Sequence, residues 1–291
     1  MELLDGKKTS LEIQIELSKK VKLMAGNGIN PPHLVAVLVG DDGASKTYVN
    51  AKVKACERIG FKSTLHHLGS ETSEKELLKL IKRLNEDDSV DGFIVQLPLP
   101  SHIDDQKITL AISPGKDVDG FHPENVGKMA LGLPTFLPAT PNGVMELLKR
   151  YKIPTEGKNT VVIGRSSIVG TPMSILMSRK SDPGNSTVTL AHSRTKNLEQ
   201  ICKQADILIV AIGIPEFVTS NMVKPNAVVI DVGIHRIEDS SKKNGFRLIG
   251  DVNFSEVSQK CSYITPVPGG VGPMTIASLL MNTYIASNDR N

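Results

Sequence analysis

The chain has few cysteines and no long apolar run, and these absences exclude several classes of protein. Its 291 residues include three cysteines, Cys56, Cys202 and Cys261, which are widely spaced and form no CxxC pair. This usage indicates free thiols in a reducing compartment rather than a disulfide framework or a metal site. No apolar run approaches the roughly 20 residues that a membrane-spanning helix needs. The first residues lack the basic and apolar regions of a secretory signal, so we expect a cytoplasmic protein.

Net charge is also low. The 34 lysines and arginines nearly balance the 31 aspartates and glutamates, which leaves a formal charge of +3. This charge is too small to favour binding to nucleic acid or to an anionic membrane. The hydrophobic fraction of 40% and the charged fraction of 22% are ordinary for a globular protein. A chain of this length predicts two domains, each large enough to bury its own core.

Hydrophobic patterning in the first half alternates between helix and strand. Apolar residues either recur at helical spacing or form short runs that end at turn residues. The predicted elements are a helix at 7–26, a strand at 34–39, a helix ending near Gly60, a strand at 61–68, a helix at 73–86 and a strand at 92–97. Strands that alternate with helices in this way indicate a parallel α/β sheet.

Two stretches rich in proline and glycine divide the chain. Residues 132–141 contain three prolines and predict a stiff crossing between domains, and residues 265–273 form a second break. A second α/β series lies between these breaks, with strands at 160–163, 187–190, 206–211 and 227–231 and helices at 169–179 and 197–204. We therefore predict one domain from residues 1–138 plus 272–291, to which the last helix at 274–286 returns, and a Rossmann-type domain from residues 139–271.

Tyr48 and Lys52 are four residues apart on a predicted helix, so both side chains can reach one small molecule. A helix-borne Tyr-x-x-x-Lys pair is typical of short-chain dehydrogenases, in which it follows the dinucleotide loop. Here the pair precedes the one candidate loop, Gly164–Gly170, by more than a hundred residues. This order indicates a substrate site in the first part of the chain and a cofactor domain in the part that follows. An ordinary solvated helix face is the alternative.

The stretch from Val161 to Pro172 has the pattern of a strand, a glycine turn and a helix start. Backbone N–H groups and the dipole at a helix N-terminus favour a pyrophosphate there. Gly164 permits the tight turn, and Gly170 permits close packing of helix and strand. The pattern departs from G-x-G-x-x-G, because Ser166 replaces the second glycine and Gly170 comes one place late. An ordinary βα turn is the alternative interpretation.

The end of the next predicted strand carries Ser193 and Arg194, where an NAD site usually has an acidic residue for the ribose. Together with Arg165 on the glycine loop, these groups suit a 2′-phosphate. A hydrogen bond to a charged group contributes on the order of 1.5–3 kcal/mol, so NADP is favoured over NAD. Exposed loop residues without a ligand are the alternative. The fold class is thus α/β with two domains, a parallel α/β substrate domain and a Rossmann-type NADP domain, with a cleft between them.

Three further features lie at strand ends or in special loops. Gln96 closes the predicted strand at 92–97, at the end where open α/β sheets bind ligands. Asp119 lies in a Lys-Asp-Val-Asp-Gly segment, whose two aspartates are also typical of turns. The glycines of Pro266–Pro273 permit a ligand to approach the backbone closely, although a plain hinge uses the same residues.

Together these segments resemble the bifunctional methylenetetrahydrofolate dehydrogenase/methenyltetrahydrofolate cyclohydrolase family. They occur in the family's order over essentially the whole chain, and the last of them is very specific. The matching segments are Tyr48–Lys52, Val95–Pro100, Lys116–Gly120, Gly164–Pro172, Asp231–Ile234, Gly250–Val252 and Pro266–Thr275.

The resemblance implies a role for each matching residue. Lys52 corresponds to the catalytic lysine that the cyclohydrolase step needs, and Gln96 to the residue that orients it. Tyr48 corresponds to the aromatic residue against the folate, and Asp119 to the carboxylate that binds its pterin. The resemblance also implies NADP as cofactor, a tetrahydrofolate substrate, no metal and a homodimer. Further implied substrate contacts are Leu97, Pro268, Gly269 and Gly272, and implied cofactor contacts are Gly164, Arg165, Ser166, Ser193, Arg194 and Ile234.

The implied chemistry suits these residue types. Oxidation of the methylene bridge passes a hydride to NADP and needs positioning more than acid–base catalysis. Hydrolysis of the methenyl bridge needs proton transfers around an attacking water, which a lysine desolvated against folate and cofactor can supply. Two residues depart from the family pattern: Ala139 stands where many members have cysteine, and His235 where asparagine is frequent. Neither falls on a position that carries the chemistry.

Three rival hypotheses remain at this point. A monofunctional dehydrogenase of the same fold is expected to lack the lysine, yet Lys52 is present. An enzyme like shikimate dehydrogenase shares the two-domain NADP plan but leaves the folate segments unexplained. A nucleotide-sensing module keeps the fold without turnover. An assay of methenyl-folate absorbance with NADP separates all three.

Overall fold

The computed structural model describes residues 1–242 and 245–290, and its chain divides into two compact units. The first unit comprises Met1–Ser10 and Thr140–Thr275, and the second comprises Leu11–Ala139 and Ile276–Asn291, of which Asn291 lies outside the described residues. We call them the six-stranded unit and the three-stranded unit after their main sheets.

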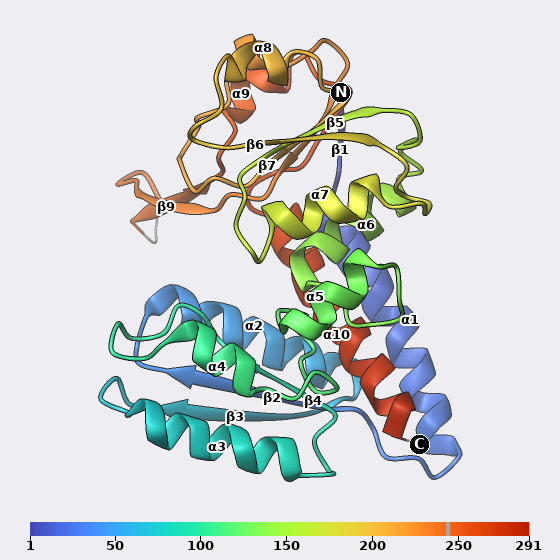
Figure 1. Cartoon of the computed structure of the whole chain (residues 1–291), viewed down its shortest axis with the longest axis vertical. Helices are drawn as coiled ribbons and strands as arrows, with labels where there is room; N and C mark the ends of the chain where they lie inside the picture. Colours follow the sequence, from blue (N-terminus) through green and yellow to red (C-terminus); the bar gives the residue numbers. More distant parts are fainter. Residues whose placement is uncertain (243–244, 291) are drawn as a thin grey trace. The chain divides into compact units, whose positions relative to one another are not determined.

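The three-stranded unit contains a parallel sheet in the order β3-β2-β4 (Figure 1). Its strands are β2 (His33–Val39), β3 (Lys62–Leu68) and β4 (Gly92–Val95). Every residue of β2 is buried, as expected for a central strand with helices on both faces. The helices of this unit are α2 (Gly43–Ile59), α3 (Glu74–Glu86), α4 (Asp105–Ala111), α5 (Pro123–Ala130), most of α1 (Gly6–Gly26) and most of α10 (Val271–Arg290).

Local sequence signals define the helices around this sheet. The helix α2 begins where the Asp42 side chain accepts a hydrogen bond from the Ser45 N–H, and it ends at Gly60, whose left-handed φ of 87° suits glycine. Ser73 and Glu76 form a capping box at the start of α3. One face of β2 packs on α3 and α4, and α2 packs on β2 and β3.

The six-stranded unit contains a parallel sheet in the order β1-β11-β8-β7-β5-β6. Figure 1 labels β1, β5, β6 and β7 of this sheet. Its strands are β1 (Glu2–Leu3), β5 (Asn159–Ile163), β6 (Thr187–Ala191), β7 (Ile207–Val210), β8 (Val228–Asp231) and β11 (Tyr263–Ile264). A separate antiparallel pair is formed by β9 (His235–Glu238) and β10 (Phe246–Ile249). The remaining elements are α6 (Ala139–Arg150), α7 (Gly170–Ser178), α8 (Leu198–Cys202), α9 (Phe254–Val257) and the 3₁₀ turn η1 (Ser220–Met222).

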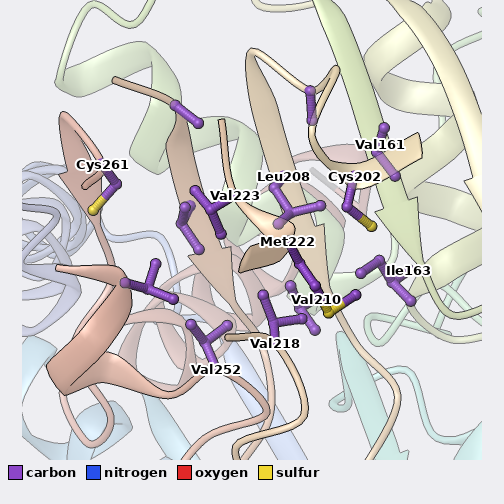
Figure 2. Packing of buried hydrophobic residues seen from close by; sticks show 14 of the residues in the cluster. Val161, Ile163, Cys202, Leu208, Val210, Val218, Met222, Val223, Val252 and Cys261 are labelled. Atoms are coloured by element: carbon purple, nitrogen blue, oxygen red, sulfur yellow. The ribbon is translucent and has the colours of Figure 1, made fainter. Parts of the chain in front are cut away.

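A buried apolar cluster supports one face of the six-stranded sheet (Figure 2). Side chains of β5 and β7, including Val161, Ile163, Leu208 and Val210, meet Cys202 of α8 and residues of η1 and α9. The helix α7 packs on β5 and β6. The carboxyl ends of the central strands are therefore fixed by a core on one side and by α7.

These elements confirm the predicted α/β class and its parallel sheets. The compact units differ from the predicted boundaries at both ends of the chain. Residues 1–10 join the six-stranded unit because β1 pairs with β11, and α10 contributes its residues up to Thr275 to the same unit. The helices α6 and α10 begin at Ala139 and Val271, inside the two stretches that were predicted to be irregular.

The structure also bears on the three cysteines and on the lack of long apolar runs in the sequence. Cys56, Cys202 and Cys261 are free and buried. Burial raises the pKa of the Cys56 thiol to about 12 and that of Cys202 to about 11, which makes these thiols poor nucleophiles. Among residues 1–242 and 245–290, no helix has the length and hydropathy to cross a membrane.

Candidate active site

Lys52 and Gln96 meet in the three-stranded unit. Lys52 Nζ donates a hydrogen bond of 3.1 Å to Gln96 Oε1, although the two residues are 44 positions apart. Lys52 is 6% exposed, and within the described part of the chain its ammonium forms no ion pair. A buried ammonium usually has a carboxylate partner. Here an amide orients the ammonium without neutralising it, which leaves the lysine available to exchange a proton with a ligand.

The orientation of the Gln96 amide is fixed by its surroundings. Gln96 N donates to Val37 O at 2.9 Å, which extends the pairing of β2 and β4 by one residue. Its side-chain Nε2 donates to Leu97 O at 2.7 Å, so Oε1 is the atom left to face Lys52. The strand end thus holds the amide in the orientation that accepts from an ammonium.

Tyr48 lies one helical turn before Lys52 on α2, on the same face. The ring is half-buried, and burial raises the pKa of its hydroxyl. A half-buried aromatic ring can stack on a flat ligand while its polar end stays accessible. The structure therefore places Tyr48 and Lys52 as the spacing predicted.

Asp119 lies in the loop between α4 and α5. Its backbone carbonyl accepts a hydrogen bond from Ala139 N at 3.1 Å, but among the described residues nothing donates to its carboxylate. The side chain is partly accessible by area, yet protein atoms surround it closely enough that desolvation raises its pKa. The negative charge of Asp117 adds to this shift, and the positive charge of Lys52 opposes it. Such a carboxylate, without a protein donor, is suited to accept hydrogen bonds from a ligand.

Leu97 and Asp119 line one small pocket at the end of β4. The wall is mostly apolar and includes Phe93, Ile108 and Phe121. The structure thus brings together two of the residues predicted to bind substrate, at the carboxyl end of a parallel strand.

The glycine loop of the six-stranded unit has the close contacts that its sequence predicted. Gly164 has φ of 115°, and a Cβ there would lie 2.0 Å from Ala211 O. A Cβ at Gly170 would lie 2.0 Å from Gly164 O, so both positions require glycine. Ser166 Oγ accepts from Val169 N at 3.2 Å and from Gly170 N at 3.4 Å, which closes the loop onto the start of α7.

The turn after β6 carries Ser193 and Arg194, both exposed. Two contacts shape this turn: Thr195 N donates to His192 O at 2.8 Å, and Arg194 N donates to His192 Nδ1 at 3.2 Å. The turn lies beside the glycine loop, because Gly164 N donates to Ala191 O at 2.9 Å. Arg165 and Arg194 form no ion pair with any described residue, so their charges are available to an anion.

The strand order reverses direction at β5. The chain proceeds from β5 to β6 on one side and returns to β7 on the other, so the carboxyl ends of β5 and β7 form a topological switch point. Ile234 follows β8 at the same edge of the sheet and is 43% exposed. The predicted cofactor residues therefore gather where an open α/β sheet binds its ligand.

Two buried aspartates at this edge had no predicted role. Asp231 accepts from Gly233 N, Asp251 N and Val252 N, and burial raises its pKa to about 7 against the effect of these donors. Asp251 accepts from Ile212 N at 2.7 Å and Gly213 N at 3.0 Å, and from His235 Nε2 at 2.7 Å. Their sequence signal was that both lie in segments that match the family, Asp231–Ile234 and Gly250–Val252.

Pro268, Gly269 and Gly272 belong to the six-stranded unit, together with the cofactor residues rather than with Lys52. The peptide bond before Pro268 is cis, and Gly269 has φ of 111°. Gly269 O accepts from Lys7 N at 2.8 Å, so the beginning of the chain holds this loop.

The residues at the switch point fit a dinucleotide. The loop leaves no room for a Cβ at Gly164 or Gly170, and α7 presents its N-terminus there. Arg165 on the loop and Arg194 on the neighbouring turn have no ion-pair partner among the described residues. A pyrophosphate needs the tight glycine loop and the helix N-terminus, and a 2′-phosphate needs the guanidinium groups.

Comparison with known proteins decides the family. The model described as the catalytic domain of tetrahydrofolate dehydrogenase/cyclohydrolase matches residues 4–119, and that of its NAD(P)-binding domain matches residues 138–291. The chain belongs to the tetrahydrofolate dehydrogenase/cyclohydrolase family. The first model spans Tyr48, Lys52, Gln96 and Asp119, and the second spans the glycine loop.

Relatives across the family match nearly the whole chain. "Bifunctional protein FolD" of Cytophaga hutchinsonii is 65% identical over 287 residues, 99% of each chain. The crystal structure of the bifunctional FolD dehydrogenase/cyclohydrolase from Campylobacter jejuni is 50% identical, covers 100% of both chains and has a TM-score of 0.93. The Trypanosoma brucei dehydrogenase-cyclohydrolase, solved with NADP cofactor and inhibitor, is 37% identical over 98% of this chain and 96% of its own, with a TM-score of 0.92.

Proposed function

We propose that this member of the family oxidises 5,10-methylenetetrahydrofolate to 5,10-methenyltetrahydrofolate with NADP, and then hydrolyses the product to 10-formyltetrahydrofolate. The observation that carries the proposal is the Lys52–Gln96 pair, a buried lysine oriented by an amide and left without a counter-ion among the described residues. A dehydrogenase alone has no need for such a lysine. The alternatives of a monofunctional dehydrogenase and of an enzyme like shikimate dehydrogenase are not favoured by the bifunctional relatives.

The first reaction needs positioning. NADP, when bound, supplies the acceptor for the hydride that leaves the methylene carbon. Tyr48 offers its half-buried ring as a surface for the folate, and the Asp119 carboxylate accepts hydrogen bonds from the pterin. Holding the reacting carbon in place contributes to catalysis by removing the entropy cost of orientation.

The second reaction needs a proton carrier. Water adds to the cationic methenyl carbon and loses one proton. The carbon–nitrogen bond to the pterin nitrogen then breaks as that nitrogen gains a proton, and the added hydroxyl loses its proton to become the formyl carbonyl, so that one proton is released in all. Lys52 Nζ is the group that relays these protons, and Gln96 Oε1 holds it in place. General acid–base catalysis of this kind typically contributes roughly 10²–10⁴-fold to the rate.

Cofactor choice follows from charge. Arg165, Ser193 and Arg194 surround the position expected for the adenosine ribose, where an NAD enzyme has an acidic residue. We propose that these three side chains bind the 2′-phosphate and make NADP the preferred cofactor.

We further propose that both reactions use one site, because the chain offers one glycine loop and one helix with a Tyr–Lys pair. The family resemblance also supports a cytoplasmic homodimer that serves one-carbon metabolism and so the synthesis of purines, methionine and histidine. Sedimentation of the purified chain tests the dimer, for which a single species at the mass of the monomer is the contrary result.

The decisive test is an absorbance assay on the full chain. With methylenetetrahydrofolate and NADP, the NADPH band and the methenyl-folate band report the dehydrogenase, and decay of added methenyl-folate reports the cyclohydrolase. We expect both signals. Hydride transfer without hydrolysis contradicts the bifunctional assignment, turnover of a hydroxy acid such as shikimate supports the second rival, and NADP binding without turnover indicates a sensor.

A further inference from the structure

Asn282 in α10 makes two contacts that reach the loop of Asp119. It lies in the part of the helix that belongs to the three-stranded unit and is 2% exposed. Its side-chain Nδ2 donates to Val118 O at 2.8 Å and to Leu137 O at 2.9 Å. Both N–H bonds of the amide are thus used on backbone carbonyls, one of which belongs to the residue directly before Asp119.

The same loop is held tightly on its other side. Ala139 N donates to Asp119 O at 3.1 Å. Gly120 has φ of 74°, and a Cβ there would lie 2.6 Å from the carbonyl carbon of Leu137. The segments 118–120 and 137–139 therefore run in close contact, and the Asn282 amide joins both of them to α10.

The Asp117 carboxylate anchors the backbone further along. It accepts from His122 N at 2.7 Å and from Asn125 Nδ2 at 2.9 Å. The backbone around Asp119 is thus fixed by its neighbours, while no described residue donates to the Asp119 carboxylate. A rigid backbone beneath a carboxylate without a protein partner is the arrangement of a preorganised binding group.

We propose that Asn282 is a positioning residue for substrate: it fixes the backbone from which the Asp119 carboxylate binds the folate. This inference rests on the proposed function, in which Asp119 binds the pterin. Asn282 acts through Asp119 and does not touch the substrate itself. Loss of its amide releases the Val118 and Leu137 carbonyls and lets the 118–120 segment move against 137–139.

The adjacent residue provides a matched control. Thr283 is 0% exposed and lies on the same helix, but its hydroxyl donates to Leu279 O within α10, at 2.8 Å. Thr283→Val therefore removes a buried hydrogen bond close to Asn282 without touching the loop of Asp119. Asn282→Leu removes both donors at similar volume, and Asn282→Ser is a smaller change for the case in which the leucine variant does not fold.

The test compares folate and NADP in the full-length chain. For Asn282→Ser we expect the KM for folate to rise about tenfold in both the dehydrogenase and the cyclohydrolase assay, the scale of one hydrogen bond to a charged group. The Kd for NADP, measured by fluorescence titration, should stay within about twofold, because independent sites rarely couple more strongly. Thr283→Val should leave both constants unchanged at a comparable loss of Tm.

A double-mutant cycle tests whether Asn282 affects folate binding through Asp119. In an Asp119→Ala background, Asn282→Ser should have no further effect on the KM for folate, since the group that it positions is gone. The inference is overturned if Asn282→Ser leaves the KM for folate unchanged, if folate and NADP affinities fall in parallel, or if the two substitutions add. If Asp119→Ala itself leaves folate binding intact, the proposed role of Asp119 fails as well. Absence of both activities in the unaltered chain instead refutes the proposed function.

Discussion

His235 Nε2 lies 2.7 Å from Asp251 Oδ1, and the carboxylate of Asp251 is fully buried. The other carboxylate oxygen holds the backbone after β7 through Ile212 N and Gly213 N. One side chain thus connects the end of β7 to the residue that follows Ile234. The departure from asparagine at position 235 therefore keeps a hydrogen-bonding group on a buried carboxylate.

His235→Leu leaves one buried oxygen of Asp251 without its donor, which costs about 1–3 kcal/mol. We expect denaturant unfolding to show this loss and NADP titration to show weaker binding, because the segment of Ile234 loses its anchor. His235→Gln, which keeps a donor, should recover most of both losses. If both variants lose the same stability and the same NADP affinity, His235 does not anchor the segment of Ile234.

Lys52→Met should remove cyclohydrolase activity from a folded protein. The substitution keeps the side-chain length and deletes the proton carrier, so hydrolysis of methenyl-folate should fall by roughly 10²–10⁴-fold. The matched control is Lys54→Met, an exposed lysine on the same helix. Hydrolysis that survives within about tenfold of the unaltered chain refutes the assignment of Lys52.

Cofactor preference should depend on Arg165, Ser193 and Arg194. Their replacement by neutral, apolar residues should weaken NADP by roughly tenfold to a hundredfold per charged contact and leave NAD nearly unchanged, because NADP alone carries the 2′-phosphate. Lys180→Gln is the control, because Lys180 is an exposed cation just beyond the carboxyl end of α7. If NADP and NAD lose affinity equally, these side chains bind the shared pyrophosphate or neither cofactor.

Both activities should respond alike to changes at Asp119. We expect Asp119→Ala to weaken folate binding in each assay by roughly tenfold or more, since a charged hydrogen bond is lost. A folate analogue should inhibit the two reactions with the same constant. Clearly different constants, or weaker binding in one assay alone, indicate two separate sites.

Stability should fall at low pH because of His33. Its ring is buried, with Nδ1 2.8 Å from Ser89 O and Nε2 2.9 Å from Thr64 Oγ1. Since a carbonyl can only accept, Nδ1 carries the proton and Nε2 accepts from the Thr64 hydroxyl in the neutral ring. Desolvation lowers the pKa of His33 below 6.5.

Proton linkage gives the direction in which pH changes the free energy of unfolding. Between the lowered pKa of the folded state and 6.5, the unfolded chain binds more protons, so the free energy of unfolding falls as the pH falls through this window and is unaffected by His33 above it. Urea titrations at about pH 8 and about pH 5 measure the loss. His33→Gln cannot titrate and should lose less stability over the same interval; an equal loss contradicts the role of His33.

The sequence predicts those elements whose signals are local. The βαβ order of residues 34–97 follows from apolar periodicity, and the end of α2 from Gly60, which takes the left-handed cap. The strand β1 has two residues and is defined by its distant partner β11, so no local pattern predicts it. Pro141 favours an irregular crossing, yet it lies in the first turn of α6, where the missing N–H has no cost.

In the candidate site, too, local sequence signals predict some features, and contacts between distant segments determine the others. Tyr48 and Lys52 share a helix face by spacing alone, and the glycine loop follows from its own residues. The contact of Lys52 with Gln96 joins segments far apart in the chain, so the resemblance predicted it and the spacing did not. Asn282 and the His235–Asp251 pair act through hydrogen bonds to distant segments, which the type of residue does not reveal.

The pairing of β1 with β11 has a consequence for how the chain folds as it is made. β1 forms the edge of the six-stranded sheet and covers β11 by parallel pairing at Glu2 and Leu3. In the order of synthesis β1 precedes every other strand of its sheet and β11 follows them, so the edge strand is present long before the strand that it covers. The six-stranded unit therefore completes its sheet only after β11 has emerged, whereas β2, β3 and β4 can pair before any of the strands β5 to β11 is made.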